Sequence, residues 1–218
     1  MEHSHSLKDF AWEMAPDGAS ATVKVKRESQ VGGNMVPQEL AYTVYADGTV
    51  DTKADFRTLP GFNLPRLGLQ TMFHRNLENV EWYGRGPMEN YPDRISAAFV
   101  GKYKTTVDAL RENYVRSQSM GCRTATRWLS LTDSVGKGVR ITALDSPFDF
   151  TALHFTDRDL WDAKYGHELD KVRRDEVVVN LDCATRGLGS ASCGPGPRPE
   201  FILAPDSTYS FSFRISPI

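Results

Sequence analysis

Apolar and polar residues alternate along much of this chain. Four stretches show the pattern clearly: residues 22–26, 50–57, 139–143 and 209–215. A period of two residues is typical of a strand that buries one face and exposes the other. Because antiparallel sheets commonly keep one solvated face, the alternation predicts an all-β fold made of antiparallel strands.

Turn-forming residues separate these strands. Asp47 and Gly48 stand between two strand-like stretches, which is a strong signal of a β-hairpin. Residues 133–138 separate two later strands in the same way. The apolar run 177–181 lacks strict alternation, so it is predicted to be a central strand that is buried on both faces.

Helix signals are scarce. The best candidate is 157–163, one or two turns long, with Asp157 as the expected N-cap. Strand–helix–strand repeats of useful length are absent from the sequence, which disfavours parallel α/β folds and (β/α)₈ barrels. The sequence predicts very little helix.

Length and charge narrow the classes of protein. A chain of 218 residues with 40% hydrophobic residues suits one large β-sandwich domain spanning 1–218. The net charge of −2 gives no basis for binding nucleic acid or an anionic membrane. No apolar run approaches the roughly 18 residues of a membrane span. The first six residues lack the apolar core of a secretory signal, and a cytoplasmic or periplasmic location stays open.

Cysteine usage bears on metals and disulfides. Cys122, Cys183 and Cys193 are an odd number without C-x-x-C spacing, which argues against a disulfide framework or a zinc site. Motifs for binding phosphate are also absent. We therefore expect no metal and no cofactor in this chain, and reduced, largely buried thiols.

Residues 82–94 form the most unusual run of the sequence. Gly84 and Gly86 can adopt positive φ angles and Pro87 lacks an N–H donor, so the run predicts a turn. It sets four polar residues on a loop braced by aromatic side chains: Glu89, Asn90, Asp93 and Arg94.

The run 82–94 resembles the Trp-Tyr-Gly-Arg-Gly-Pro-x-Glu-Asn-Tyr-x-Asp-Arg block of the C-terminal, small-chain domain of glycoside hydrolase family 2 β-galactosidases. Residues 114–121, 148–154 and 187–195 resemble further blocks of that domain, in the same order. The resemblance implies a galactose-mutarotase-like super-sandwich of two large antiparallel sheets.

The resemblance also implies a non-catalytic role. Retaining glycosidases need two carboxyl groups about 5–5.5 Å apart. In the family that this chain resembles, both are glutamates on a catalytic barrel, which this chain lacks. The expected function is that of an accessory domain, which packs on the barrel of a parent β-galactosidase and helps to wall its active-site cleft. The isolated chain is expected to be inactive. Glu89 and Asp93 are expected to brace their loop through Arg94 or backbone amides.

Two other functions stay open. One is a self-contained sugar-binding module for galactosides, and the other is an aldose 1-epimerase-like enzyme. An epimerase of this fold uses a His acid beside a Glu base, and His154 has no recognisable Glu partner in the sequence. Arg123 is expected either to face an interdomain cleft or to brace the loop that carries Glu89 and Asp93.

A second loop is a candidate for contact with ligands. Residues 189–199, here called the late loop, are rich in Gly, Pro and Ser, and we expect this loop to be exposed. Cys193 occupies the position where better-known family members carry a tryptophan that stacks on the sugar. The candidate substrate-binding residues are therefore Glu89, Asn90, Asp93, Arg94, Arg123, His154 and Cys193.

Overall fold

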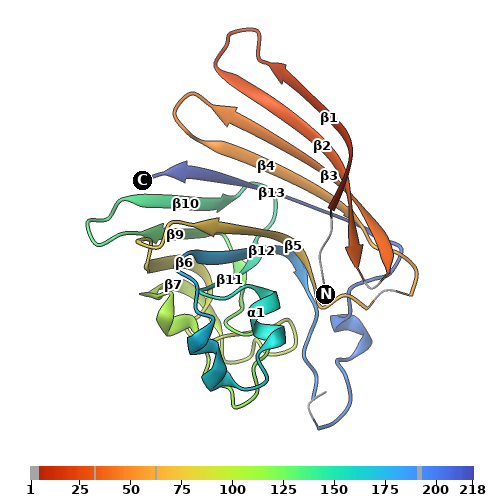
Figure 1. Ribbon diagram of the computed structural model, residues 1–218, viewed down its shortest axis with the longest axis vertical. Helices are drawn as coiled ribbons and strands as arrows, with labels where there is room; N and C mark the ends of the chain where they lie inside the picture. The colour runs from red at the N-terminus through yellow and green to blue at the C-terminus, as the bar shows by residue number, and fades with distance from the viewer. Residues whose placement is uncertain (1–4, 32, 62, 191–192) are drawn as a thin grey trace.

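Two antiparallel sheets make up the structure, a computed structural model that describes residues 5–31, 33–61, 63–190 and 193–218 (Figure 1). Within these ranges the larger sheet has nine strands, in the order β1 (His5–Met14), β2 (Ser20–Val31), β3 (Asn34–Tyr45), β4 (Val50–Arg57), β13 (Thr208–Pro217), β10 (Gly138–Ala143), β9 (Trp128–Thr132), β6 (Asn79–Gly86) and β7 (Phe99–Thr106).

The smaller sheet has four strands in the described residues, in the order β5 (Arg66–Phe73), β12 (Val177–Thr185), β11 (Phe148–Leu153) and β8 (Arg123–Thr126). All pairings that link neighbouring strands are antiparallel. The structure confirms the predicted all-β sandwich. It also confirms that residues 177–181 form part of a central strand, β12, which is fully buried along this run.

Both predicted hairpins are present. Gly48, in the turn between β3 and β4, has a φ of 85°, and the Asp47 carboxylate accepts a hydrogen bond from the Thr49 N–H at 2.9 Å. In the turn between β9 and β10, the Asp133 carboxylate accepts from Val135 N at 2.9 Å. Each aspartate thus closes its own turn, which is why these residue types favour such turns.

The hydrophobic core lies between the two sheets. Trp82 of β6 and Phe150 of β11 meet edge to face across it, with ring centroids 5.9 Å apart. Phe56 of β4 and Phe211 of β13 stack at 6.2 Å on the same side of the larger sheet. The alternating residues of the sequence supply these inward-facing side chains, as the period-two pattern requires.

Helix is limited to short segments in the described residues. They are α1 (Asp157–Asp162) and the 3-10 turns η1 (Asp108–Leu110), η2 (Gly166–Lys171) and η3 (Pro199–Phe201). The prediction of Asp157 as N-cap is wrong. Thr156 caps α1, because its hydroxyl accepts from Asp159 N at 3.1 Å while the Asp159 carboxylate accepts from Thr156 N. Such a reciprocal capping box satisfies two backbone N–H donors at once. None of the helices in the described ranges is long and apolar enough to span a membrane.

The predicted reason for the glycines of the run 82–94 is also wrong. Gly84 and Gly86 lie inside strand β6, and their φ angles are outside the left-handed region. A Cβ on Gly86 would lie 2.8 Å from the Trp82 ring and 2.9 Å from the Tyr103 ring. Glycine is therefore needed here for close packing against aromatic rings. The chain leaves the strand at the cis peptide bond between Gly86 and Pro87.

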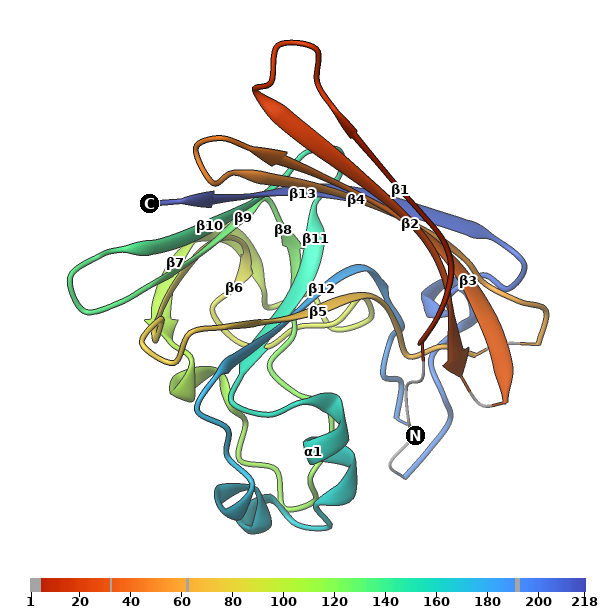
Figure 2. The ribbon, with the colours of Figure 1, turned by 45° about the horizontal axis from the view of Figure 1, so that its top comes forward.

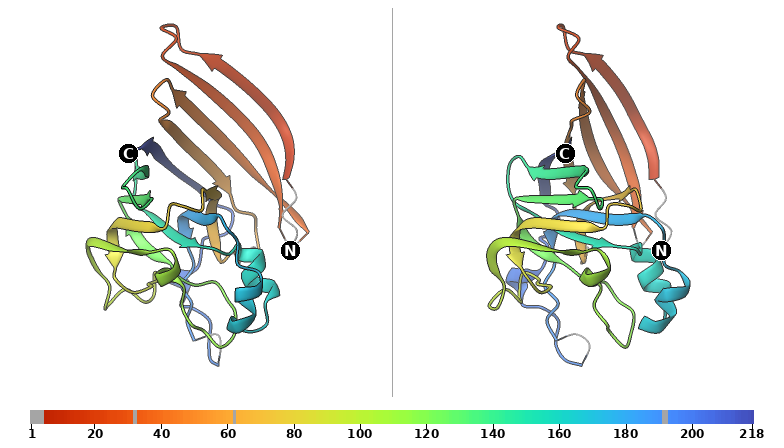
Figure 3. Two further views of the ribbon diagram at one scale, coloured as in Figure 1. Left: turned by 60° about the vertical axis from the view of Figure 1, so that its left-hand side comes forward. Right: turned by 90° about the vertical axis from the view of Figure 1, so that its left-hand side faces the viewer.

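The two sheets overlap only in part. Figure 1 shows β1–β3, coloured red to orange, fanning away from the rest of the molecule, and Figures 2 and 3 show the same projection from other sides. We call these three strands the wing, and the remainder of the sandwich the body. The candidate site residues all lie in the body.

Candidate functional site

Glu89 lies on the loop that follows β6 and is half-buried. Its carboxylate accepts a short hydrogen bond from the Tyr114 hydroxyl and another from Gly121 N at 2.8 Å. Burial, together with this carboxylate, raises the pKa of Tyr114. Burial and Glu89 likewise raise the pKa of the neighbouring Glu112 carboxyl. Glu89 thus ties three segments of the body together.

Asn90 is completely buried and is held by hydrogen bonds within the protein. Its side-chain oxygen accepts from Thr124 N at 3.0 Å and from the Thr124 hydroxyl, and its amide nitrogen donates to Met88 O at 3.0 Å. Its backbone N–H donates to Cys122 O at 2.9 Å. A buried amide that is hydrogen-bonded in this way fixes the path of the loop.

Asp93 and Arg94 hold the start of the late loop. The Asp93 carboxylate accepts from Leu188 N at 3.0 Å and from Gly189 N at 2.6 Å. Arg94 donates from its guanidinium to Gly189 O at 2.9 Å. Gly187 packs so closely on Asp93 that an added Cβ would lie 2.7 Å from the carboxyl carbon. We call these contacts the clasp, because they fasten one loop to the other.

Arg123 supports the loop that follows β6 through a hydrogen bond to Pro87. Its side chain is buried, Nε donates to Pro87 O at 2.9 Å, and the guanidinium lies 5.8 Å from the centre of the Trp82 ring. Burial lowers the pKa of Arg123. Of the two expectations for this residue, the geometry supports the brace, because the guanidinium points into the protein.

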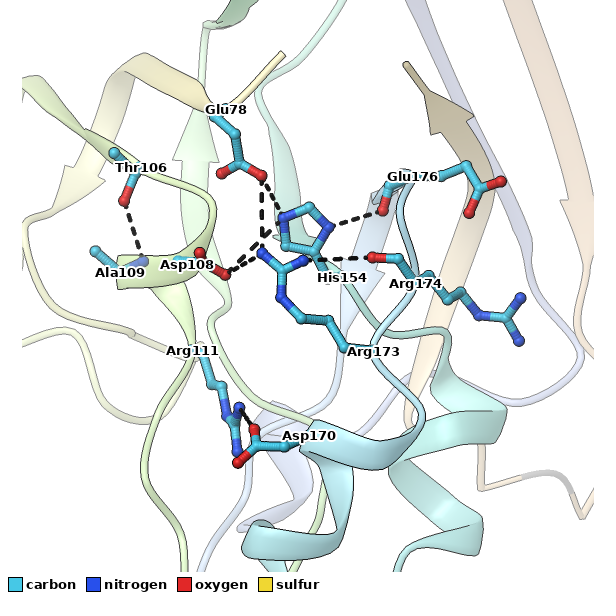
Figure 4. A network of polar contacts seen from close by, with 10 residues as sticks. All are labelled: Glu78, Thr106, Asp108, Ala109, Arg111, His154, Asp170, Arg173, Arg174 and Glu176. Atoms are coloured by element: carbon cyan, nitrogen blue, oxygen red, sulfur yellow. Dashed lines mark hydrogen bonds and ion pairs between the residues drawn. The ribbon is translucent and has the colours of Figure 1, made fainter. Parts of the chain in front are cut away.

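His154 lies in a separate network, drawn in Figure 4. Its side chain is only 2% exposed, Nδ1 lies 3.0 Å from the Glu176 carbonyl oxygen, and Nε2 lies 2.5 Å from the Glu78 carboxylate. Asp108 is 3.9 Å from Nε2 and pairs with Arg173 at 2.7 Å. Both ring nitrogens face oxygen atoms of the protein, so both are engaged within the fold.

The expectation that His154 lacks a Glu partner is therefore wrong. Glu78 precedes β6 of the larger sheet and His154 follows β11 of the smaller sheet, 76 positions away, so the packing of the two sheets brings them together. The pair still does not resemble the acid and base of an epimerase. Both nitrogens of His154 are already engaged, and the ring is buried, so neither nitrogen is placed to donate a proton to a sugar.

A buried group of charges escaped the sequence analysis. Arg66 of β5 forms a short ion pair with Asp182 of β12, whose side chain is 3% exposed, and lies 3.1 Å from Asp157. Burial alone would lower the pKa of Arg66. The carboxylates of Asp182 and Asp157 have the larger combined effect, so the pKa of Arg66 is raised. Nearby, burial raises the pKa of Asp149 to about 6. The polar positions of β11 and β12 were the only signal in the sequence.

Cys193 is exposed, as predicted. The other two thiols are less accessible: Cys122 is buried and Cys183 is half-buried, and burial raises the pKa of both, that of Cys183 to about 12. Of the three thiols that we expected to be largely buried, only that of Cys122 is completely buried. Residues 191 and 192 of the late loop lie outside the described ranges.

A hollow of about 560 Å³ lies beside η2, and its lining includes Tyr114, the hydrogen-bond partner of Glu89, but none of the predicted site residues. Asn113, Tyr114 and Asp170 line it, together with the stacked rings of Tyr165 and His167, whose centroids are 5.7 Å apart. Groups of three or more metal-binding side chains are absent from the described part of the chain.

The candidate site as a whole is a set of loops held together by hydrogen bonds. Comparison with known proteins identifies the family of the chain. The chain belongs to the family described as the β-galactosidase small chain, which it matches over residues 2–215. It is 28% identical to a β-galactosidase of Streptococcus thermophilus over 90% of its length and 19% of that protein. It is 33% identical to a β-galactosidase of Vibrio cholerae over 80% of its length and 16% of that protein. The chain spans about a fifth of the length of the curated relatives it matches.

Proposed function

We propose that this chain is a non-catalytic accessory domain of a β-galactosidase, which packs on the catalytic domain and helps to form one wall of its active-site cleft. The observation that carries this proposal is the clasp. Asp93 and Arg94 lie in the run that most resembles the family. Asp93 accepts hydrogen bonds from the backbone N–H groups of Leu188 and Gly189, and Arg94 donates one to the Gly189 carbonyl oxygen. These residues hold a loop in place, and they are not directed at a substrate.

The same observation argues against catalysis by Glu89 and Asp93. Each carboxylate accepts hydrogen bonds from backbone N–H groups, Glu89 from Gly121 and Asp93 from Leu188 and Gly189. A glycosidase needs one carboxyl group that is free to donate a proton and one that is free to attack the sugar. We expect no hydrolysis of a chromogenic β-galactoside by the isolated chain. Turnover that is lost on Glu89→Gln would contradict this.

The role of the clasp can be tested in the parent enzyme. Asp93→Asn replaces an acceptor by a group that cannot satisfy both N–H donors equally well, so the late loop shifts relative to the cleft. Small displacements of positioning groups can reduce catalysis by about 10- to 100-fold. We expect kcat/KM for a β-galactoside to fall by about 10-fold or more at nearly unchanged stability of the remaining enzyme.

Asp133→Asn is the matched control. Asp133 also accepts from two backbone N–H groups, those of Val135 and Lys137, both at 2.9 Å, but in the turn between β9 and β10. It should disturb its own turn and leave kcat/KM unchanged. Equal losses of activity in the two variants would mean that the clasp has no special role.

A sugar-binding module is the second candidate, favoured by the hollow beside η2. Its stacked Tyr165 and His167 and the polar Asn113 and Asp170 are the kinds of side chain that hold sugars. Titration with galactose followed by NMR separates the two functions. The accessory domain should bind at millimolar concentration or not at all, with shifts confined to the late loop. Micromolar binding that perturbs Tyr165 and His167 would favour the module.

A further inference from the structure

Toward its outer strand β1, the wing has no second layer above it in the described residues, although β3 still carries buried side chains such as Leu40. The larger sheet has nine strands and the smaller has four, and Figures 1 and 3 show β1–β3 extending past the smaller sheet. A sheet with one apolar face is stable in water when that face packs against another layer. The chemistry of the two faces of the wing therefore decides whether a layer is missing.

One face of the wing is apolar. Residues directly opposite each other in an antiparallel pair place their side chains on the same face. The register of β1 and β2 sets three apolar pairs: Phe10 with Val25, Trp12 with Val23, and Met14 with Ala21. The exposed fractions are 55% for Phe10, 65% for Trp12 and 58% for Met14.

This apolar face continues the core of the body. Val25 of β2 is opposite Leu40 of β3, and Leu40 is opposite Ala54 of β4. Leu40 and Ala54 are buried in the core, and Val25 packs against it. From β4 outward to β1, one row of apolar side chains thus passes from buried to exposed. The larger sheet therefore extends beyond the smaller sheet that packs on it.

The opposite face of the wing is suited to water. Lys24 pairs with Glu13 at 2.9 Å, and Lys26 pairs with Glu39 at 3.2 Å, all with exposed side chains. Such pairs contribute little to stability, but they mark a solvated surface. Because these ion pairs lie on one face, the apolar residues of the other face are not a sign of a generally apolar edge. They form a patch of the kind that marks an interface.

The smaller sheet has an open edge on the side of the wing. β8 lies against β6, and β12 lies against β13, so β5 at the far end of the smaller sheet lies toward β4 and the wing. β5 pairs with β12 on one side, and its other edge has no strand partner within the described ranges. Strands added to that edge would lie over the apolar face of β1–β3.

We propose that a stretch of the parent β-galactosidase outside residues 1–218 covers the apolar face of the wing, in β conformation, and extends the smaller sheet from the edge of β5. The proposal rests on the proposed function, which makes this chain part of a longer enzyme. The curated relatives are about five times as long as this chain, so such an enzyme has ample polypeptide to supply the layer. Addition of a strand pairs the N–H and C=O groups of an open edge and buries alternate side chains.

Photo-crosslinking in the intact parent enzyme tests the proposal. p-Benzoylphenylalanine replaces Trp12, which keeps an aromatic ring on the apolar face. After irradiation, mass spectrometry should find crosslinks to peptides of the same polypeptide that lie outside residues 1–218. The matched control carries the same probe at Glu13, the next residue along the strand but on the charged face. Its crosslinking yield should be at least 10-fold lower.

The outcomes separate this inference from the proposed function. Crosslinks from position 12 to residues 5–45 of a second copy, or no crosslinks from a folded and active enzyme, would overturn the inference about the wing and leave the accessory role standing. A natural protein whose intact mass is 24.4 kDa, that of the 218 residues alone, would overturn the accessory role itself. It would also remove the proposed occupant of the wing.

Discussion

The body and the wing are built from the same kind of strand and yet differ in how their apolar residues are used. In the body, the alternating residues of two sheets meet, and Trp82 is 1% exposed. In the wing, the same alternation continues, and Trp12 is 65% exposed. Alternation therefore specifies a strand and the face that it is built to bury. It does not ensure that the layer to cover that face lies within these residues.

The largest expected effect separates the two tryptophans. Trp82→Ala should reduce the free energy of unfolding by about 3–5 kcal/mol, because it leaves a cavity against Phe150 and Tyr103. Trp12→Ala should change it by no more than about 0.5 kcal/mol, since the ring is exposed. Unfolding in urea measures both. Similar losses for the two variants would show that the wing is already packed in the isolated chain.

A pH series tests the buried charges of the body. Burial holds the pKa of Asp149 at about 6 in the folded state, above its ordinary value of 3.8. A carboxyl with a raised pKa favours folding while it is protonated, so its contribution is present below about pH 4 and is lost as the pH rises through 6. The loss is at most about 3 kcal/mol.

Asp149→Asn removes this dependence. Its amide stays neutral, so the difference in unfolding free energy between variant and wild type should shift in favour of the variant between pH 4 and pH 7. Asp55→Asn is the control, because it removes the same charge from a partly exposed side chain of β4. A difference that stays constant with pH for Asp149→Asn would mean that Asp149 is ionised without cost in the fold.

Gly86→Val tests why the run 82–94 contains its second glycine. We expect a loss of about 1–3 kcal/mol, because valine would press on the rings of Trp82 and Tyr103. Gly196→Val is the control, since a Cβ at Gly196 would meet no atom within 4 Å. An unchanged melting midpoint for Gly86→Val would show that the rings can yield and that the packing is not tight.

The smallest effect on stability is expected at Cys193. Cys193→Ser should change the free energy of unfolding by less than about 0.5 kcal/mol. In the native protein, a thiol reagent should modify Cys193 before Cys183 and Cys122, because Cys193 is exposed while burial shields the other two thiols and raises the pKa of each. Modification of Cys122 at a similar rate would mean that the body opens easily.

The sequence predicts the features that depend on local chemistry. The alternation of apolar residues and the Asp47-Gly48 turn depend on side-chain period and backbone preference, and both predictions are confirmed. The sequence predicts a short helix at 157–163, and the structure has it at Asp157–Asp162, although its cap is Thr156 and not Asp157. The error arose because the residue that caps a helix lies just before the first helical residue. The sequence pattern did not show whether the helix begins at Asp157 or one residue later.

Features that depend on distant neighbours were not predictable in the same way. The requirement for Gly86 comes from Tyr103 on the adjacent strand, and the Glu78 partner of His154 comes from the packing of one sheet on the other. The clasp joins Asp93 to Gly189, almost a hundred positions away. The sequence pointed to these residues through resemblance to a family, but only the fold shows that their polar atoms hold the protein together.

Hydrogen exchange of the isolated chain, followed by mass spectrometry, tests the contrast between body and wing most directly. Amides of β12, which is central and buried, should stay protected for hours at neutral pH. Amides of β1, an edge strand with an uncovered face, should exchange within seconds to minutes, and those of β2 at intermediate rates. Protection of β1 equal to that of β12 would contradict the account, because it would show that the wing is stable without a further layer.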